Sequence, residues 1–297
     1  MSKTVNTSLI ERAKKLTNCL VLDDQTLKKI MNLLEIEFQR GLKDEESAAI
    51  KMFITYVRNL PNNDEKGRYL ALDLGGTNFR VILIDFNTNE TKMENEIFKI
   101  PEELMVSEGE LLFDFIADCI IQFTKKRHLD QMRLALGFTF SFPCVQYGLC
   151  QAKLVTWTKG FNCGHVVGRD VVKLLKKALK KRSQATSAFV DIVALINDTT
   201  GTLMSCAHKN PNCDIGLIVG TGTNACYIEK LENIEKWPSN YSEPKQVLIN
   251  TEWGAFGDNK VIDFIKTEWD SEIDSKSMNR GKQTFEKMVS GLYLGEM

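Results

Sequence analysis

Two short turns rich in glycine and threonine recur in this sequence, each between apolar segments that are typical of β-strands. The first reads D-L-G-G-T-N-F-R at residues 73–80, and the second reads V-G-T-G-T-N at residues 219–224. Glycine-containing turns between such segments predict two hairpins. The strands that we expect are residues 69–73, 81–86, 215–219 and 226–229. We interpret the repetition as a duplicated core whose two loops face a single cleft.

Turns of this kind are suited to holding phosphate, because several backbone N–H groups converge and glycine lets an anion approach them. Asp73 ends the first strand beside its turn, a position that suits Mg²⁺ or its water shell, since Mg²⁺ prefers oxygen ligands. One such turn is equally consistent with a plain hairpin, but two, one with an acid, favour a nucleotide-binding cleft. Neither G-x-x-x-x-G-K-S/T nor, around the turns, G-x-G-x-x-G occurs, which argues against P-loop and dinucleotide-binding proteins.

The remaining segments predict a mixture of helices and strands. Residues 8–60 are expected to be mainly helical, with Asp23 or Asp24 placed to cap a helix, before a polar break at residues 61–67. Further helices are expected over residues 110–127, 171–182 and 260–269, and further strands over residues 133–138 and 192–196. This alternation predicts α/β layers.

Composition narrows the classes of function. The 297 residues carry a formal net charge of −1, which gives no reason to expect nucleic acid or an acidic membrane as partner. The basic run at residues 176–182 is interpreted as the solvated end of a helix. Eight cysteines without a C-x-x-C pair, and three scattered histidines, argue against a disulfide framework and a zinc site. Because the N-terminus lacks an apolar signal and no run of about 18 apolar residues occurs, we expect a cytosolic protein without a membrane span.

Two polar side chains could carry phosphoryl-transfer chemistry. Asp198 follows the apolar segment 192–196, where it could accept a hydroxyl proton as that hydroxyl attacks phosphorus. An equally good local reading makes Asp198 the cap of the following helix. Lys159, in W-T-K-G-F, could neutralise phosphate charge in the transition state. The alternative makes Trp157 and Phe161 core residues and leaves Lys159 in solvent.

Three further side chains could bind a polyol. Ser141 ends the apolar run L-G-F-T-F-S-F-P and would be exposed there, although its hydroxyl could equally satisfy a turn. Glu252 and Glu286 offer carboxylates, which accept hydrogen bonds from sugar hydroxyls. Glu286 is the weaker of the two, because a solvated helix face explains it as well.

Taken together, these segments resemble the eukaryotic hexokinase/glucokinase family. The matching strings, in family order, are L-A-L-D-L-G-G-T-N-F-R, L-G-F-T-F-S-F-P, W-T-K-G-F, N-D-T, G-L-I-V-G-T-G-T-N-A-C-Y and N-T-E-W-G-A-F-G-D. They extend from about Tyr69 to Asp258, and the likeness continues to Gly295. Ile54 and Ala152 depart from the residues usual in the family, proline and glycine, and we expect small effects on packing.

The resemblance implies an α/β protein with the actin-like ATPase (ribonuclease H-like) fold, in which two domains enclose a cleft that closes on sugar. The small domain would be residues 67–197, and the large domain would combine residues 1–66 with 198–297. Family members continue past G-L-Y-L-G-E, so we expect the large domain to be incomplete on the adenosine side. A chain ending at Met297 is expected to be poorly stable and weakly active.

The implied activity is transfer of the γ-phosphoryl group from ATP·Mg²⁺ to the 6-hydroxyl of a hexose, with glucose, mannose and fructose as the expected substrates and Asp198 as general base. The implied hexose ligands, of which Phe142 and Glu286 rest on the resemblance alone, are Ser141, Phe142, Thr158, Lys159, Asn197, Asp198, Asn224, Glu252 and Glu286. The implied phosphate loops are Asp73, Leu74, Gly75, Gly76, Thr77, Asn78 and Arg80, and then Thr221, Gly222 and Thr223. Asp73 would hold Mg²⁺ through water. We expect a monomer.

Two other classes of function stay open at this point. A non-catalytic sugar-binding or regulatory protein would keep the sugar residues and lack turnover. An actin-like or chaperone-type ATPase would share the fold and both phosphate loops, but it would leave S-F-P, W-T-K-G-F and N-T-E-W-G without a role.

Overall fold

The computed structural model describes residues 2–62, 64–76, 78–87, 91–129, 131–183, 189–238 and 242–296, with the side chains of 2–8 and 183 excepted. The chain divides into two compact units. Unit 1 consists of Met1–Met52, Ile218–Asn224 and Thr251–Met297, and unit 2 consists of Phe53–Leu217 and Ala225–Asn250. Thr77, one of the residues expected in the first phosphate loop, lies outside the described residues.

Unit 2 contains a five-stranded sheet in the order β4-β3-β2-β5-β8. Its strands are β2 (Arg68–Leu74), β3 (Asn78–Asp85), β4 (Lys92–Lys99), β5 (Arg133–Phe140) and β8 (Phe189–Ile196). The pairs β2/β3 and β3/β4 are antiparallel, whereas β5 runs parallel to both β2 and β8. The first predicted hairpin is therefore confirmed. Parallel pairing also brings the carboxyl ends of β2, β5 and β8 to the same edge of the sheet.

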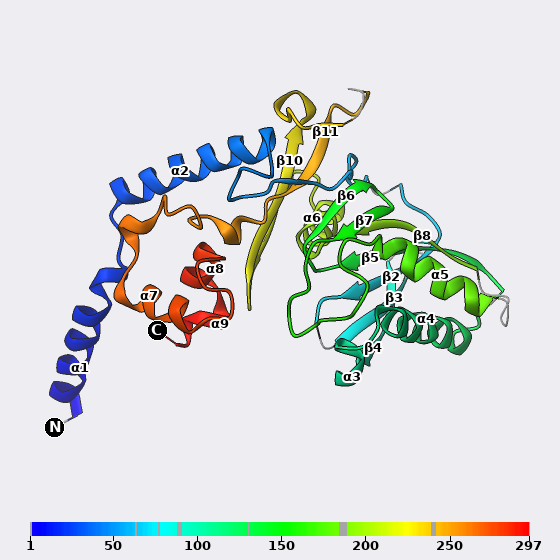
Figure 1. Ribbon diagram of the computed structural model, residues 1–297, viewed down its shortest axis with the longest axis horizontal. Coiled ribbons are helices and arrows are strands. Elements are labelled where there is room, and N and C mark those ends of the chain that lie inside the picture. The colour runs from blue at the N-terminus through cyan, green and yellow to red at the C-terminus, as the bar shows by residue number, and fades with distance from the viewer. Residues whose placement is uncertain are drawn as a thin grey trace. The chain divides into compact units, whose positions relative to one another are not determined.

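Two helices pack on this sheet. Figure 1 shows α4 (Gly109–Lys126) and α5 (Val171–Ser183) side by side, close to where sequence periodicity predicted them. Their buried apolar residues join those of the strands in one core, which includes the fully buried Ile116 and Leu175 of the helices and Leu72 and Leu136 of the strands. An amphipathic helix needs such a partner surface, which is why the 3.6-residue period predicted both helices well.

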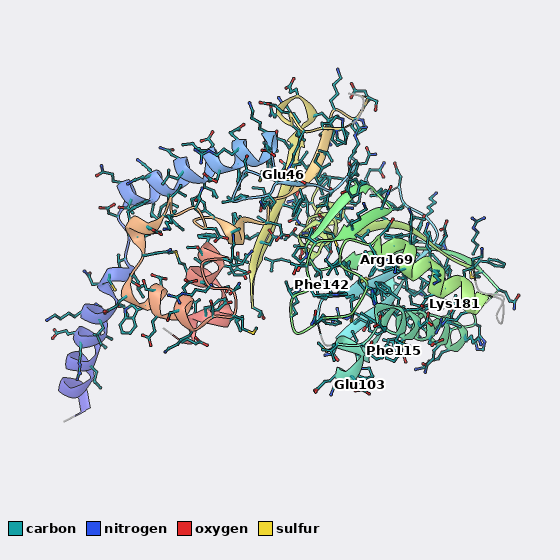
Figure 2. All side chains as sticks on the ribbon, viewed as in Figure 1. Glu46, Glu103, Phe115, Phe142, Arg169 and Lys181 are labelled. Carbon is teal, nitrogen blue, oxygen red and sulfur yellow. The ribbon has the colours of Figure 1, made fainter. Side chains whose placement is uncertain are left out.

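The basic run on α5 pairs with the acidic side chains of α4. Lys181 bonds to Glu110, and Arg182 donates to Asp118 at 2.5 and 2.7 Å. Lys181 lies on the α5 surface (Figure 2) and remains 44% exposed. The run is thus exposed, as expected, but its charges serve helix–helix contact rather than solvation alone.

Smaller elements complete unit 2. They are α3 (Glu102–Met105), the antiparallel hairpin β6 (Cys144–Gly148) and β7 (Gln151–Leu154), α6 (Asp198–Lys209) and η2 (Leu231–Asn233).

A second sheet has the order β1-β11-β10-β9. Its strands are β1 (Phe53–Ile54), β9 (Ile215–Val219), β10 (Thr223–Lys230) and β11 (Gln246–Asn250). The neighbouring β9 and β10 confirm the second predicted strand–turn–strand segment. Ile218–Asn224, which comprises the turn with the end of β9 and the start of β10, belongs to unit 1, and the remaining residues of the sheet belong to unit 2.

The helices of unit 1 are α1 (Ser2–Thr17), η1 (Asn18–Leu20), α2 (Asp24–Lys43), η3 (Trp253–Ala255), η4 (Asp263–Ile265), α7 (Glu268–Lys276), α8 (Thr284–Val289) and α9 (Gly291–Leu294). Asp23 caps α2, where its side chain accepts from the Thr26 N–H at 2.7 Å. No helix in the described part of the chain is long and apolar enough to cross a membrane.

The helix predicted over residues 260–269 is wrong. Lys260 has a φ of 71°, in the left-handed region, and only the short 3-10 turn η4 follows it. The α-helix begins at Glu268 instead, where Thr267 and Asp270 form a reciprocal capping box. The box satisfies backbone N–H groups at the first turn of α7, which fixes the start of the helix at this position.

Candidate active site

In unit 2, the first glycine loop lies beside the S-F-P segment. The Ser141 N–H donates to the Leu74 carbonyl at 3.1 Å, which extends the β2/β5 pairing by one residue. A Cβ atom added to Gly75 would lie 3.7 Å from Ser141 Oγ. The structure therefore brings together two segments that are more than 60 residues apart in sequence. Leu74 itself is fully buried, and its carbonyl is occupied by the Ser141 N–H.

Three charged groups act electrostatically on Asp73 at the end of β2. Burial raises the pKa of Asp73, and the Asp198 carboxylate raises it further, while Arg80 and Lys159 act in the opposite direction. Arg80 stands opposite Asp73 in the antiparallel register of β2 and β3. Two acids and two cations predicted separately from the sequence thus interact electrostatically within one unit, as in sites that handle charged substrates.

The capping of α6 resolves the two local readings of Asp198. The N-cap is Asn197, whose Oδ1 accepts from the Thr200 N–H at 3.1 Å and from its hydroxyl at 2.6 Å. The Asn197 Nδ2 also donates to Thr199 Oγ1 at 2.7 Å. Asp198 is the first helical residue, and its carboxylate accepts from the neighbouring Thr199 N–H at 2.9 Å. Because Asn197 fixes the helix terminus, Asp198 does not serve as its cap.

The W-T-K-G-F segment combines an apolar anchor with a fixed cation. Trp157 and Phe161 stack at 5.4 Å between ring centroids, and both contact the ring of Phe142, a residue that is 5% exposed. Phe142 is labelled in Figure 2. The core reading of Trp157 and Phe161 therefore holds. Lys159 is exposed, yet its Nζ donates to the Ser141 carbonyl at 2.9 Å.

Backbone conformation also marks Lys159. Its φ is 56°, and Gly160 follows with a φ of 82°. A left-handed conformation is costly for a residue with a side chain, and such strain gathers at functional sites. Thr158 closes this turn, because its carbonyl accepts from the Phe161 N–H at 3.1 Å.

In unit 1, Asn224 and Glu252 form a reciprocal pair. Asn224 Nδ2 donates to Glu252 Oε1 at 3.0 Å, and the Glu252 N–H donates to Asn224 Oδ1 at 3.1 Å. Glu252 has φ 55° and ψ 42°, again left-handed for a residue with a long side chain. The pair holds a carboxylate and an amide, two groups that suit sugar hydroxyls, in one fixed arrangement.

Glu286 does not lie on a solvated helix face, which corrects the local interpretation of this residue. It is half-buried on α8, and its Oε2 accepts from the Thr223 N–H in the second glycine loop at 2.9 Å. A Cβ atom added to Gly222 would lie 2.5 Å from the same oxygen. The tip of α9 also contacts this loop, since the Gly291 N–H donates to the Gly220 carbonyl at 2.7 Å and the Leu292 N–H to the Thr221 carbonyl at 3.2 Å.

Three residues that the sequence did not single out hold α8 in place. Asp258 accepts from the N–H groups of Gln283 and Thr284, at 3.2 and 2.9 Å, and so satisfies the first donors of the helix. Lys287 donates to Asp274 at 2.6 Å. Asp258 closes the string N-T-E-W-G-A-F-G-D, so its position was visible in the sequence, but its role depends on a helix 26 residues away.

The donor set beside the first loop fits Mg²⁺. No group of three or more His, Cys, Asp or Glu side chains gathers anywhere in the described ranges. Mg²⁺ does not require one, because it is commonly held by one or two carboxylates together with waters and phosphates. Burial raises the pKa of Asp73 and disfavours its ionised form. A cation bound nearby would offset this effect, because it favours the carboxylate.

A cavity of about 640 Å³ lies elsewhere in unit 2. It is lined by Arg133 and Phe189, the first residues of β5 and β8, whereas Ser141 and Asn197 follow the last residues of these strands. The candidate site therefore rests on convergent polar groups and not on cavity size.

Comparison with known proteins yields one consistent family. Two models described as hexokinase match residues 12–208 and 214–297. Hexokinase-2 of Rattus norvegicus is 45% identical over 298 residues, and hexokinase-2 of Homo sapiens is 48% identical over 281 residues. These matches cover 99% and 93% of this chain but 32% and 30% of the relatives, so the chain spans about a third of their length.

Solved structures give the same result. A hexokinase from Schistosoma mansoni, complexed with glucose, has a TM-score of 0.86 at 41% identity, covering 98% of this chain and 65% of that one. A second hexokinase crystal structure has a TM-score of 0.78 at 34% identity. The predicted fold class is thus confirmed as the actin-like α/β fold of the sugar kinases.

Proposed function

Because this chain belongs to the hexokinase family, we propose that the protein transfers the γ-phosphoryl group of ATP to the 6-hydroxyl of a hexose. The observation that carries the proposal is the group of four charges in unit 2, in which Arg80, Asp198 and Lys159 all act electrostatically on Asp73. A general base, a carboxylate for a hydrated cation and a point cation are the parts that phosphoryl transfer needs.

Asp198 acts as the general base. As the 6-oxygen forms its bond to the γ-phosphorus, the carboxylate takes the hydroxyl proton, and the bond from phosphorus to the bridging oxygen of ADP breaks. Asn197 supports this role, because it serves as the N-cap of α6 and Asp198 is not needed as the cap. Lys159, whose Nζ donates to the Ser141 carbonyl, stabilises the negative charge of the phosphoryl group in the transition state.

The hexose is bound through hydroxyl groups. In unit 2 we assign Ser141, the backbone of Phe142, Thr158, Lys159, Asn197 and Asp198 to the sugar, and in unit 1 we assign Asn224, Glu252 and Glu286. The reciprocal Asn224–Glu252 pair supports the second assignment, since it presents fixed donors and acceptors. Glucose is the first candidate, because the Schistosoma mansoni relative was solved with it.

The two glycine loops bind phosphate. We assign the first to Asp73–Asn78 with Arg80, and the second to Thr221, Gly222 and Thr223. Asp73 would hold Mg²⁺ through water, and the ion would neutralise charge on the phosphates. The division into a small domain at 67–197 and a large domain from 1–66 and 198–297, the cytosolic address and the monomeric state stay predictions.

The test is identification of the product by phosphorus NMR after incubation with ATP, Mg²⁺ and glucose. Formation of hexose 6-phosphate with ADP supports the proposal. Glucose that protects the protein against heat without any product would favour the non-catalytic sugar-binding alternative. ATP hydrolysis at the same rate with and without sugar would favour the actin-like ATPase alternative. It would contradict both hexose phosphorylation and non-catalytic sugar binding.

A further inference from the structure

The second glycine loop already holds an anion of its own. Glu286 Oε2 accepts from the Thr223 N–H at 2.9 Å, and the same oxygen lies 2.5 Å from where a Cβ atom of residue 222 would be. The carboxylate therefore rests directly on the glycine of the loop. Thr223 is 5% exposed, and its hydroxyl is also used, as donor to the Ile218 carbonyl and acceptor from Trp253 Nε1.

This arrangement has a consequence for phosphate binding. A phosphate oxygen and a carboxylate oxygen are the same kind of partner for a backbone N–H, and one N–H makes one strong hydrogen bond at a time. The Glu286 carboxylate also opposes phosphate binding sterically, because it occupies the space beside Gly222 that another anion would need. Like charges at this distance also repel each other.

The rest of α8 is too well anchored to follow its carboxylate. Asp258 holds the first N–H groups of the helix, and the buried Lys287 next to Glu286 is paired with Asp274. Release of the Thr223 N–H therefore requires rotation of the Glu286 side chain rather than movement of the helix.

We propose that Glu286 is a built-in competitor for the second phosphate loop, which leaves the Thr223 N–H when hexose hydroxyls bind its carboxylate. The inference rests on the proposed function, since it takes the loop as a phosphate site and Glu286 as a sugar ligand. It couples the two substrates within unit 1, because hexose binding draws Glu286 away and frees the Thr223 N–H for the polyphosphate.

The experiment measures the affinity of the whole chain for inorganic tripolyphosphate by calorimetry, with and without glucose. Glu286→Ala is compared with wild type and with the matched control Glu252→Ala, which removes another carboxylate from the same unit. We expect Glu286→Ala to bind tripolyphosphate about tenfold more tightly without glucose, as loss of one charge-assisted competitor predicts. Glucose should tighten binding to wild type and leave Glu286→Ala unchanged.

Each other outcome overturns the inference in a recognisable way. Equal increases in Glu286→Ala and Glu252→Ala would mean that net charge, not competition, sets the affinity, and the proposed function would stand. If no variant binds tripolyphosphate, the assignment of this loop as a phosphate site is wrong. Protection of the protein against heat by glucose would then test separately whether the chain binds sugar. If Glu286→Ala fails to fold, Glu286→Gln keeps the side chain's size, and its tripolyphosphate affinity must still exceed that of Glu252→Gln.

Discussion

Lys287 and Asp274 form an ion pair at 2.6 Å in which the lysine side chain is only 3% exposed. The pair joins α7 to α8, and Lys287 also donates to the Asn279 carbonyl at 2.9 Å. An ammonium group can be buried in this way only with such partners, because its desolvation is costly. The pair therefore holds α8 where Glu286 meets the second glycine loop.

Removal of the carboxylate from this pair should destabilise the protein. Asp274→Ala leaves the Lys287 charge buried and uncompensated, for which we expect a loss of about 3 kcal/mol in the free energy of unfolding. Urea unfolding measures the loss. Glu272→Ala serves as control, since its exposed pair with Lys276 should contribute less than about 1 kcal/mol. Similar losses for the two variants would contradict the account of α8.

The same pair predicts a pH dependence of stability. Burial alone would raise the pKa of Asp274, but the hydrogen bonds from Lys287 and Gly281 and the lysine charge bring it below its ordinary value of 3.8. A carboxyl whose pKa is lowered on folding stabilises the protein above its unfolded pKa, and this contribution is lost as pH falls through the lowered value. Denaturation titrations from pH 6 to pH 2 should show the loss in wild type, and Asp274→Asn should reduce it.

Asp73 should behave in the opposite way. Burial raises its pKa, so its ionised form is disfavoured in the folded protein, and folding at neutral pH proceeds against that cost. We expect Asp73→Asn to increase the free energy of unfolding by about 0.5–2 kcal/mol at pH 7 while it reduces turnover. Thermal unfolding and ADP release measure the two effects. A variant that is both less stable and fully active would refute this reading of Asp73.

A side chain at residue 222 is expected to displace the Glu286 carboxylate from the second glycine loop. A methyl group there would meet Glu286 Oε2 at 2.5 Å, whereas a methyl group on Gly76 in the first loop would meet nothing within 4 Å. The carboxylate is the flexible end of a side chain, so it should move aside at a stability cost of about 1 kcal/mol or less. Because hexose binding already requires Glu286 to leave the Thr223 N–H, we expect Gly222→Ala to bind glucose about tenfold more tightly, the effect of one charged hydrogen bond that no longer has to be broken. Gly76→Ala is the control, and equal effects would contradict the placement of Glu286.

The sequence predicted those features that depend on local pattern. The apolar segments around both glycine turns, and the helical spacing of α4 and α5, identified buried faces that the structure contains. β4 escaped prediction because it is an edge strand whose side chains, K-M-E-N-E-I-F-K, are mostly exposed, so no apolar period marks it.

The errors have identifiable physical causes. Residues 260–269 have apolar spacing that suits a helix, but the Thr267–Asp270 capping box, which was legible in the sequence, starts the helix later. Glu286 was undervalued because its partner, the Thr223 N–H, lies 63 residues away. Asn197 and Asp198 are adjacent residues that both cap helices well, so only the structure could tell which one does.

The most direct test of the central claim is the rate of hexose-dependent ADP release by Asp198→Asn, beside wild type and Asp191→Asn. Asp191 is an exposed carboxylate on β8 that pairs with Lys176, so its variant matches the change in charge without touching the site. Loss of a general base predicts a rate about 10²- to 10⁴-fold below wild type for Asp198→Asn, with Asp191→Asn close to wild type. Equal rates for Asp198→Asn and wild type would contradict the account.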